Sequence, residues 1–232
     1  MLHLTSVLDA AELAQVRAML AEADWEDGRT TSGSLPAQIK RNRQLPAQAA
    51  ATQRLQQLVL NALRRNQLFF SAALPRQIAP PMFSRYQGSA SHPGDYLADH
   101  VDVAMRILPD GEKIRTDLSC TLFLSDPEEY AGGELVVHDS WRDEQVKLKA
   151  GDMLLYPADK IHRVNPVTAG QRYASFFWIE SMVRSEEQRR LLFQMDRDLM
   201  LLRASAQDGQ SSAVLGLTGA YHNLLRMWGQ GG

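Results

Sequence analysis

The stretch Asp117-Leu-Ser-Cys-Thr-Leu-Phe-Leu124 alternates between two sets of side chains. Its even-numbered positions are leucine or cysteine, and its odd-numbered positions are Asp117, Ser119, Thr121 and Phe123. Successive side chains of a strand point to opposite faces, so this period of two predicts a β-strand with one strongly apolar face.

Similar short patterns occupy much of the chain around this strand. They read ELVVH (134–138), VKLK (146–149), DMLLY (152–156) and RYASFFWI (172–179), and turn-forming residues separate them. Several short antiparallel strands at this spacing predict a sandwich, a jelly roll or a barrel. We therefore expect an α+β protein with a mainly β core over residues 80–180.

Helical periodicity flanks the β region on both sides. Asp9 and Glu12 form a capping-box pattern before a first helix, and a second helix is predicted from about Pro46 to Asn66. After residue 180, Ser185 opens another capping pattern, and a last helix is expected over 213–228. The apolar stripe of the first C-terminal helix either packs against the β domain or forms a subunit interface. It consists of Leu191, Leu192, Met195, Leu199 and Leu202.

Composition excludes several classes of protein. The 232 residues include 25 basic and 27 acidic side chains, a net charge of −2 that argues against nucleic-acid binding. The single cysteine, Cys120, excludes an internal disulfide and is expected to be a buried apolar residue. There is no apolar run of 18 residues and no signal-peptide pattern at the N-terminus, so we expect a cytoplasmic protein without membrane contact.

Four side chains suggest a metal centre. His100 and Asp102 are two residues apart, a spacing that points both to one face of a strand. His162 follows 62 residues after His100, and Arg172 opens the apolar strand 172–179 on the same face as Ala174, Phe176 and Trp178. An inward-facing guanidinium needs an anion, such as a ligand carboxylate. Two histidines and one carboxylate are the facial triad of non-haem Fe(II) oxygenases.

The sequence here resembles a known family, the Fe(II)/2-oxoglutarate-dependent dioxygenases of the prolyl-4-hydroxylase type. Within that superfamily it is most similar to the bacterial PKHD-type hydroxylases. The shared residues, in chain order, are His100-Val-Asp102, Thr116–Leu124, Gly132-Gly-Glu-Leu135, Gly151–Tyr156, His162, Arg172 and Ala174–Trp178. The specific match covers about residues 80–196. The stretch 39–45 and the C-terminal helices extend the resemblance towards the whole chain.

The resemblance implies His100, Asp102 and His162 as iron ligands and Arg172 as the anchor of the 2-oxoglutarate C5 carboxylate. It implies a double-stranded β-helix (jelly roll) with N-terminal buttressing helices, in a domain over residues 1–180 whose helices occupy 1–70. Residues 181–232 would form a C-terminal helical extension. The implied reaction couples oxidative decarboxylation of 2-oxoglutarate, to succinate and CO2, to hydroxylation of a substrate. L-ascorbate is the family's usual reductant.

The same resemblance leaves the substrate open. Relatives act on prolyl or lysyl side chains in proteins or on small molecules, and the proximity of some genes to iron-uptake genes suggests a substrate from iron homeostasis by analogy. Phe123 stands where some relatives carry a tyrosine that binds the C5 carboxylate. A second donor must therefore come from Tyr86, Thr121 or a water molecule, and Tyr86 is either that contact or a core tyrosine.

Other polar residues have two interpretations each. His92, in the loop 88–96, is either a substrate-lid residue or a solvated histidine, and His138 is either a stray ligand or a strand-end residue. His3 and His222 are expected at the surface, and Gly132-Gly133 at a turn before a strand. The basic residues Lys40, Arg41 and Arg43 form a solvated loop face or contact an anionic substrate.

Three functions compete at this point. The leading one is the hydroxylase. A second is a non-catalytic sensor that binds a metal or a 2-oxo acid on the same jelly-roll fold, and a third is a cupin-type metalloenzyme. The sequence lacks the His-x-His pattern that would favour a cupin. The C-terminal helices offer a contact for a homo-oligomer.

Overall fold

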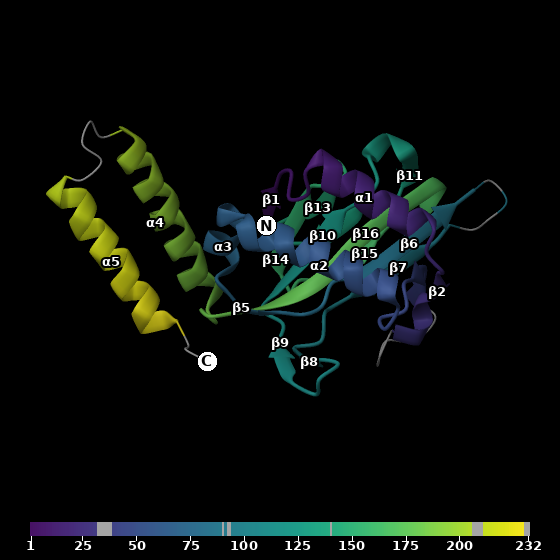
Figure 1. Ribbon diagram of the computed structural model, residues 1–232, viewed down its shortest axis with the longest axis horizontal. Helices are drawn as coiled ribbons and strands as arrows, with labels where there is room; N and C mark the ends of the chain where they lie inside the picture. Colours follow the sequence, from purple (N-terminus) through teal and green to yellow (C-terminus); the bar gives the residue numbers. More distant parts are fainter. Residues whose placement is uncertain (32–38, 90, 92–93, 140, 206–210, 230–232) are drawn as a thin grey trace.

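Two antiparallel sheets form the centre of the computed structural model (Figure 1). The structure describes residues 1–31, 39–89, 91, 94–139, 141–205 and 211–229. The larger sheet has the order β1 (Leu2–Leu4), β14 (Met153–Pro157), β10 (Leu118–Phe123), β16 (Val167–Ser181), β6 (Met82–Gly88), β4 (Arg43–Gln44) and β2 (Glu26–Asp27). Two further strands, β5 (Pro75–Ile78) and β11 (Tyr130–Gly132), also pair with β16.

The smaller sheet lies against the inner face of the larger one. Its order is β13 (Asp143–Val146), β12 (Leu135–His138), β15 (His162–Val164), β7 (Tyr96–His100) and β3 (Lys40–Arg41). A separate hairpin, β8 (Met105–Ile107) with β9 (Lys113–Arg115), stands beside the two sheets (Figure 1). Two antiparallel sheets with side chains interdigitated between them make the jelly roll that the resemblance implies.

The alternation in β10 is confirmed, although both of its faces are buried. Leu118, Cys120 and Leu122 pack in the core between the larger sheet and the helices, whereas Phe123 packs between the two sheets. Cys120 is 1% exposed, as expected for an apolar cysteine. A central strand is covered on both sides, so its polar face points into the space between the sheets rather than into solvent.

Helices cover the outer face of the larger sheet. These are α1 (Ala10–Ala21) and α2 (Ala50–Arg65), with α3 (Gln67–Ala73) at one end (Figure 1). The capping box is confirmed: Asp9 accepts a hydrogen bond from the Glu12 amide at 2.9 Å, and Glu12 accepts one from the Asp9 amide at 3.0 Å. Leu55 and Val59 of α2 are fully buried, each contributing about 1.5–3 kcal/mol of burial.

The structure corrects three sequence-based boundaries. Helix α2 begins at Ala50 rather than at Pro46. It ends at Arg65, and a separate helix, α3, follows, because the side chain of Asn66 accepts a hydrogen bond from the Phe69 amide and so caps the start of α3. The strand predicted over 146–149 is β13, Asp143–Val146. Its partner β12 begins opposite Val146 at Leu135, so the pairing of these two strands ends there and does not include residues 147–149.

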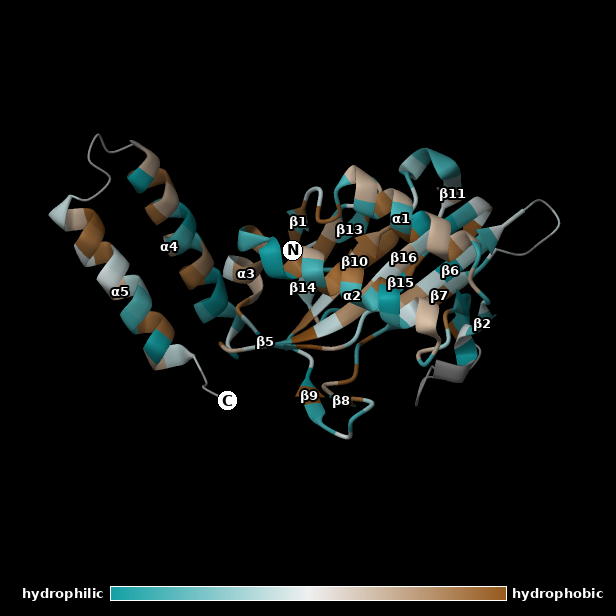
Figure 2. Ribbon diagram, in the orientation of Figure 1, coloured by the Kyte–Doolittle hydropathy of each residue, from teal (hydrophilic) through white to brown (hydrophobic). Residues whose placement is uncertain are grey.

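The C-terminal helices α4 (Glu186–Ser205) and α5 (Ser212–Trp228) form a hairpin that projects from the β core (Figure 1). Leu192 and Leu199 of the predicted stripe are buried against Tyr221 of α5 and against Leu74 and Val183. The stripe therefore packs partly on α5 and partly on the end of α3 and the residues that follow β16, and its use as a subunit interface stays a prediction. Hydrophobic and hydrophilic residues are interspersed along both helices (Figure 2).

Two sequence-based interpretations concern residues outside the described ranges. They are the role of His92 in its loop and most of the polar linker between the C-terminal helices. In the part of the chain that the structure describes, no helix has the length and apolar character needed to cross a membrane.

Candidate functional site

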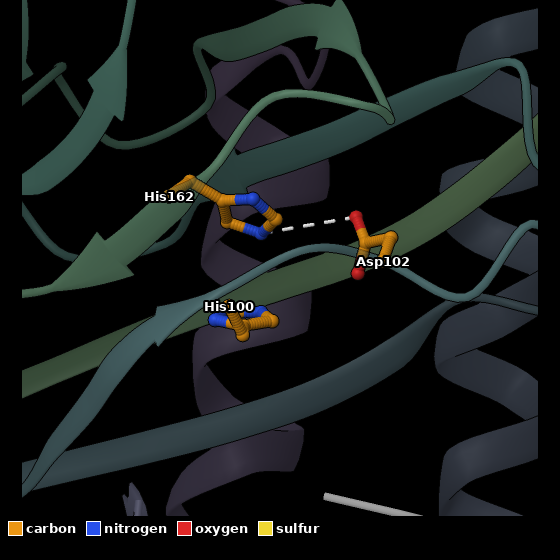
Figure 3. Close-up of side chains that lie close together, drawn as sticks. All are labelled: His100, Asp102 and His162. Atoms are coloured by element: carbon orange, nitrogen blue, oxygen red, sulfur yellow. Dashed lines mark ion pairs between the residues drawn. The ribbon is translucent and has the colours of Figure 1, made fainter.

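The structure brings His100, Asp102 and His162 together where β7 and β15 pair in the smaller sheet (Figure 3). The ends of β7 and β15 pair, with His100 directly opposite His162 in the register. One potential ligand atom from each of the three residues lies within 4.8 Å of the others. This separation suits three atoms that surround a single metal ion.

Hydrogen bonds orient both imidazoles. Nδ1 of His100 donates to the Ala98 carbonyl oxygen at 2.9 Å, and Nδ1 of His162 donates to the Lys160 carbonyl oxygen at 3.0 Å. With Nδ1 protonated, Nε2 of each neutral ring keeps its lone pair for a metal. Nε2 of His162 lies 3.7 Å from Oδ2 of Asp102, as the dashed line in Figure 3 marks. The rings of the two histidines are 4.2 Å apart between centroids.

Ser119 holds the carboxylate of the cluster. Ser119 lies on the polar face of β10, and its Oγ donates a hydrogen bond to Oδ2 of Asp102 with a length of 2.6 Å. Sequence reasoning did not single out Ser119, although its place on the cavity-facing side of β10 was a usable signal. Burial lowers the pKa of His100, and the neighbouring His162 adds to this effect. The histidine therefore stays neutral near pH 7, as metal ligation requires.

Arg172 lies in the same cavity as the three ligand candidates, on the strand face predicted from the sequence. The cavity has a volume of about 350 Å³, and Ala174, Phe176 and Trp178 also line it. Arg172 is 1% exposed, and its Nε and Nη2 have no hydrogen-bond partner among the described residues. A buried guanidinium with free donors fits a carboxylate ligand that is held by a two-point fork.

Two aromatic rings flank the guanidinium. Its Cζ lies 5.4 Å from the ring centroid of Tyr86 and 5.3 Å from that of Phe123. Tyr86 and Thr121 both line the cavity, and of these two candidates for a second donor Tyr86 is opposite Arg172 in the register, whereas Thr121 is opposite Phe176. Tyr130, which the sequence analysis did not consider, is also buried, and the neighbouring Arg172 partly offsets the rise that burial causes in the pKa of its hydroxyl.

The remaining polar residues separate into surface and cavity positions. His138 pairs with Asp99 at 2.9 Å and Asp143 at 2.7 Å, which raises its pKa, and it lies outside the three-residue cluster. His3 pairs with Asp152 at 2.7 Å. The side chain of His222 is exposed, as are those of Arg41 and Arg43.

Lys40 differs from the other two members of the basic cluster, because it is buried and lines the cavity. Gly132, the last residue of β11, and Gly133, which follows it in the turn before β12, have φ values of +68° and +69°. This left-handed conformation favours glycine.

Comparison with known proteins agrees with this geometry. Residues 81–180 match the model of the 2OG-Fe(II) oxygenase superfamily, and residues 186–230 match the PKHD-type hydroxylase C-terminal domain. A PKHD-type hydroxylase from Variovorax paradoxus is 56% identical, over 98% of both chains. One from Nitrosomonas europaea is 51% identical, again over 98% of both chains.

Solved structures share the fold at lower identity. A prolyl hydroxylase from Trichoplax adhaerens, in complex with a peptide of hypoxia inducible factor, has a TM-score of 0.55 at 16% identity and covers 82% of this chain and 86% of its own. The carbocyclase SnoK of nogalamycin biosynthesis has a TM-score of 0.53 at 16% identity, covering 78% and 79%. The full-length similarity to curated relatives shows that this chain belongs to the PKHD-type hydroxylases, enzymes of the 2OG-Fe(II) oxygenase superfamily.

Proposed function

We propose that His100, Asp102 and His162 bind Fe(II) and that Arg172 binds the C5 carboxylate of 2-oxoglutarate. The enzyme then hydroxylates its substrate while 2-oxoglutarate is converted to succinate and CO2. One observation carries this proposal: the facial triad and a buried guanidinium with unpartnered donors line the same cavity. An anion anchor beside a three-ligand metal site is the arrangement that a chelating 2-oxo acid requires.

The protein's own groups orient the reactants. The backbone acceptors behind His100 and His162 direct Nε2 of each ring towards the metal position, and Ser119 restrains the rotation of the Asp102 carboxylate. Bound Fe(II) supplies the redox chemistry that couples O2 to the oxidation of 2-oxoglutarate and of the substrate. The apolar walls of the cavity exclude water and strengthen the attraction between Arg172 and a carboxylate.

The second donor to that carboxylate stays a proposal among Tyr86, Thr121 and a water molecule. The positions of Tyr86 and Thr121 on the cavity wall support the two side chains as candidates. Ascorbate as the reductant and a link to iron uptake belong to the proposal as well, and both rest on the family resemblance alone. A cytoplasmic location also stays a proposal. The substrate is either a small molecule or a protein side chain.

Anaerobic binding tests this function directly. We expect Mn(II), as a redox-stable substitute for Fe(II), to bind the purified protein, and 2-oxoglutarate to bind the Mn(II) form. With Fe(II) and O2, slow formation of succinate should occur even without the substrate. Asp102→Ala and His162→Ala should abolish succinate formation, whereas Arg172→Ala should mainly raise the 2-oxoglutarate concentration required. Failure of the wild-type protein to bind Mn(II) or 2-oxoglutarate contradicts the proposal, and binding without succinate favours a sensor.

The C-terminal helices support a second part of the proposal, a homo-oligomer. Leu201 of α4 is 64% exposed, and Leu215 of α5 is 57% exposed. Two apolar helix faces of this kind gain free energy when a second copy covers them. Sedimentation equilibrium should show a concentration-dependent dimer that Leu201→Glu with Leu215→Glu dissociates, whereas a wild-type monomer at all concentrations contradicts it.

A further inference from the structure

Exposed apolar side chains of the β core gather beside the metal-ligand candidates. Among the described residues from β6 to β16, six large hydrophobic side chains are exposed, by 42% to 94%. Four of them follow His100 in one segment, one precedes His162, and one lies in the turn between β12 and β13. We call this set the apolar rim, and its members are Val101, Val103, Met105, Ile107, Trp141 and Ile161.

Strand pairing places the apolar rim at the end of the smaller sheet that carries the triad. The two histidines of the triad are opposite each other in β7 and β15, and β12 pairs with β15 beside them. Val101 follows this row on the β7 side, and Ile161 precedes it on the β15 side. The turn with Trp141 begins at the same end, because the His138 amide donates to the Ile161 carbonyl oxygen at 2.9 Å.

The apolar rim borders the cavity that holds the triad and Arg172. Four of its members, Val101, Val103, Met105 and Ile107, line that cavity. A substrate must pass these side chains to reach the metal position. Large exposed apolar patches are uncommon on soluble proteins and mark interaction sites. We therefore interpret the apolar rim as a substrate contact rather than as accidental exposure.

The segment that carries most of the apolar rim is held in place by buried contacts. Oγ of Thr116 donates to the Val103 carbonyl oxygen at 2.6 Å. Strand β8 pairs with β9, where Ile114 is fully buried and Arg115 forms an ion pair with Asp117 at 2.7 Å. The exposed side chains of β8 therefore stand on an anchored hairpin, so little ordering is needed when a partner covers them.

The size of the cavity indicates what covers the apolar rim. Its volume is about 350 Å³. Pockets that enclose a drug-sized ligand measure about 300–1,000 Å³, and this one must also hold the metal and 2-oxoglutarate. The remaining room suits a single side chain, so the body of the substrate lies outside, against the apolar rim. Tryptophan and methionine are enriched at protein–protein interfaces, and the highly exposed Trp141 is an anchor of that kind.

We propose that the primary substrate is a polypeptide segment whose apolar side chains dock on the apolar rim while another of its side chains enters the cavity. The apolar rim decides which segments bind, and the cavity decides which side chain reacts. This inference rests on the proposed function, because the triad and the cosubstrate define the reacting position. It narrows the substrate to a macromolecule with an apolar recognition segment.

Two defined peptide libraries test this inference by binding. The protein is saturated with Mn(II) and 2-oxoglutarate without O2 and titrated with fluorescein-labelled, amidated nonapeptides, and fluorescence anisotropy is measured. Both libraries have a varied central residue and serine at every second flanking position. The other flanking positions are leucine, isoleucine, valine, phenylalanine or methionine in the apolar library, and threonine, asparagine or glutamine in the polar library. The apolar library should bind about tenfold or more tightly, because it removes apolar surface from water.

Variants then assign this preference to the apolar rim. Trp141→Ser should reduce the apolar-over-polar ratio about tenfold, and Met105→Ser about fivefold, while binding of Mn(II) and 2-oxoglutarate stays unchanged. Ile107→Ser gives a second test on β8. The matched controls are Phe70→Ser on α3 and Met200→Ser on α4, which are half-exposed outside the cavity and should keep the full ratio.

Two further probes distinguish a peptide from other apolar occupants. N-acetylleucinamide represents a small molecule, and vesicles of dioleoylphosphatidylcholine represent a lipid surface. Both should bind the loaded protein much more weakly than the apolar library. The inference is wrong if N-acetylleucinamide binds as tightly as the library, or if the vesicles bind more tightly and lose binding in Trp141→Ser.

The outcomes separate this inference from the proposed function. If Mn(II) and 2-oxoglutarate do not bind, the proposed function fails before any peptide is added. If both bind but the apolar library does not exceed the polar one, the inference is wrong and the function stands. The inference is also wrong if Trp141→Ser and Met105→Ser both keep the full ratio.

Discussion

Replacing Arg172 with methionine should stabilise the ligand-free protein and remove its response to 2-oxoglutarate. The guanidinium is 1% exposed, and its Nε and Nη2 have no hydrogen-bond partner among the described residues. The rings of Tyr86 and Phe123 face it at 5.4 and 5.3 Å. Arg172 is therefore arranged for a ligand, and the folded protein carries a cost when that ligand is absent.

The magnitude follows from these contacts. Two buried donors without partners cost about 2–6 kcal/mol together, at about 1–3 kcal/mol each. Two desolvated cation–π contacts offset about 2–4 kcal/mol, and water that enters the cavity offsets some of the remainder. Methionine keeps an apolar stem against the two rings, so we expect a net gain of about 1–2 kcal/mol. For a chain of this size, that gain raises Tm by about 2–8 °C.

The order of stability of the wild type and Arg172→Met should reverse when 2-oxoglutarate is added. At a concentration 100 times its Kd, 2-oxoglutarate stabilises the wild-type Mn(II) protein by about 2.7 kcal/mol, and Arg172→Met should lose most of this effect. Differential scanning calorimetry without O2, with Mn(II) and with or without 2-oxoglutarate, measures both quantities. Arg54→Met, on the exposed side of α2, should leave both within about 0.5 kcal/mol of the wild type.

Two results would refute this reasoning, and they point to different errors. A ligand-free Arg172→Met protein that melts several degrees below the wild type means that Arg172 stabilises the fold through contacts other than those described. If 2-oxoglutarate raises the Tm of Arg172→Met as much as that of the wild type, the cosubstrate carboxylate binds elsewhere in the cavity.

Three further predictions concern the metal site, a turn and a buried lysine. Ser119→Ala should weaken Mn(II) binding about 10- to 100-fold in anaerobic titrations, because the triad carboxylate loses its 2.6 Å hydrogen bond; unchanged affinity would contradict this role. Gly132→Ala should lower the free energy of unfolding by about 3 kcal/mol or more, because a Cβ at φ +68° would overlap the Pro166 carbonyl oxygen. Gly111→Ala, at φ +88° with open space around it, should cost only about 1 kcal/mol in the same urea titration. Burial lowers the pKa of Lys40 from its ordinary value of 10.5 to about 8. The unfolded chain therefore binds more protons between these pH values, and this group's contribution to stability rises with pH across that window by up to about 3 kcal/mol. Urea unfolding from pH 8 to 10.5 should show no such rise in the stability of Lys40→Met. If the stabilities of the wild type and Lys40→Met depend on pH in the same way, burial does not lower the pKa of Lys40.

Local patterns were enough to predict much of the β core. The alternation over 117–124 separated the two faces of β10, and the same reasoning placed Arg172 on one face of β16 with Trp178. These predictions succeeded because the period of two in a strand depends on backbone geometry alone. The capping box at Asp9 was readable for a similar reason, since its two hydrogen bonds join residues three apart.

Other features depended on partners that are distant in the chain. The pattern VKLK predicted a strand, but a strand also needs a neighbour, and β12 supplies one only as far as Val146. The apolar stripe of α4 was identified correctly as buried in part. The sequence left open what covers it, which is α5 together with Leu74 and Val183, because periodicity shows that a face is covered but not which surface covers it. The candidate site was also predicted only in part, because the sequence indicated its four residues but not the groups around them.

The sequence by itself determined the chemistry of the candidate site: two histidines, one aspartate and one inward-facing arginine. Only the tertiary structure decided that they meet, because the pairing of β7 with β15 sets His100 opposite His162 across 62 residues of chain. It also decided what surrounds them, since Ser119 reaches the cavity from β10 and Tyr86 from β6. Ligand type is a property of single side chains, whereas distance and burial arise when separate strands pack around one cavity.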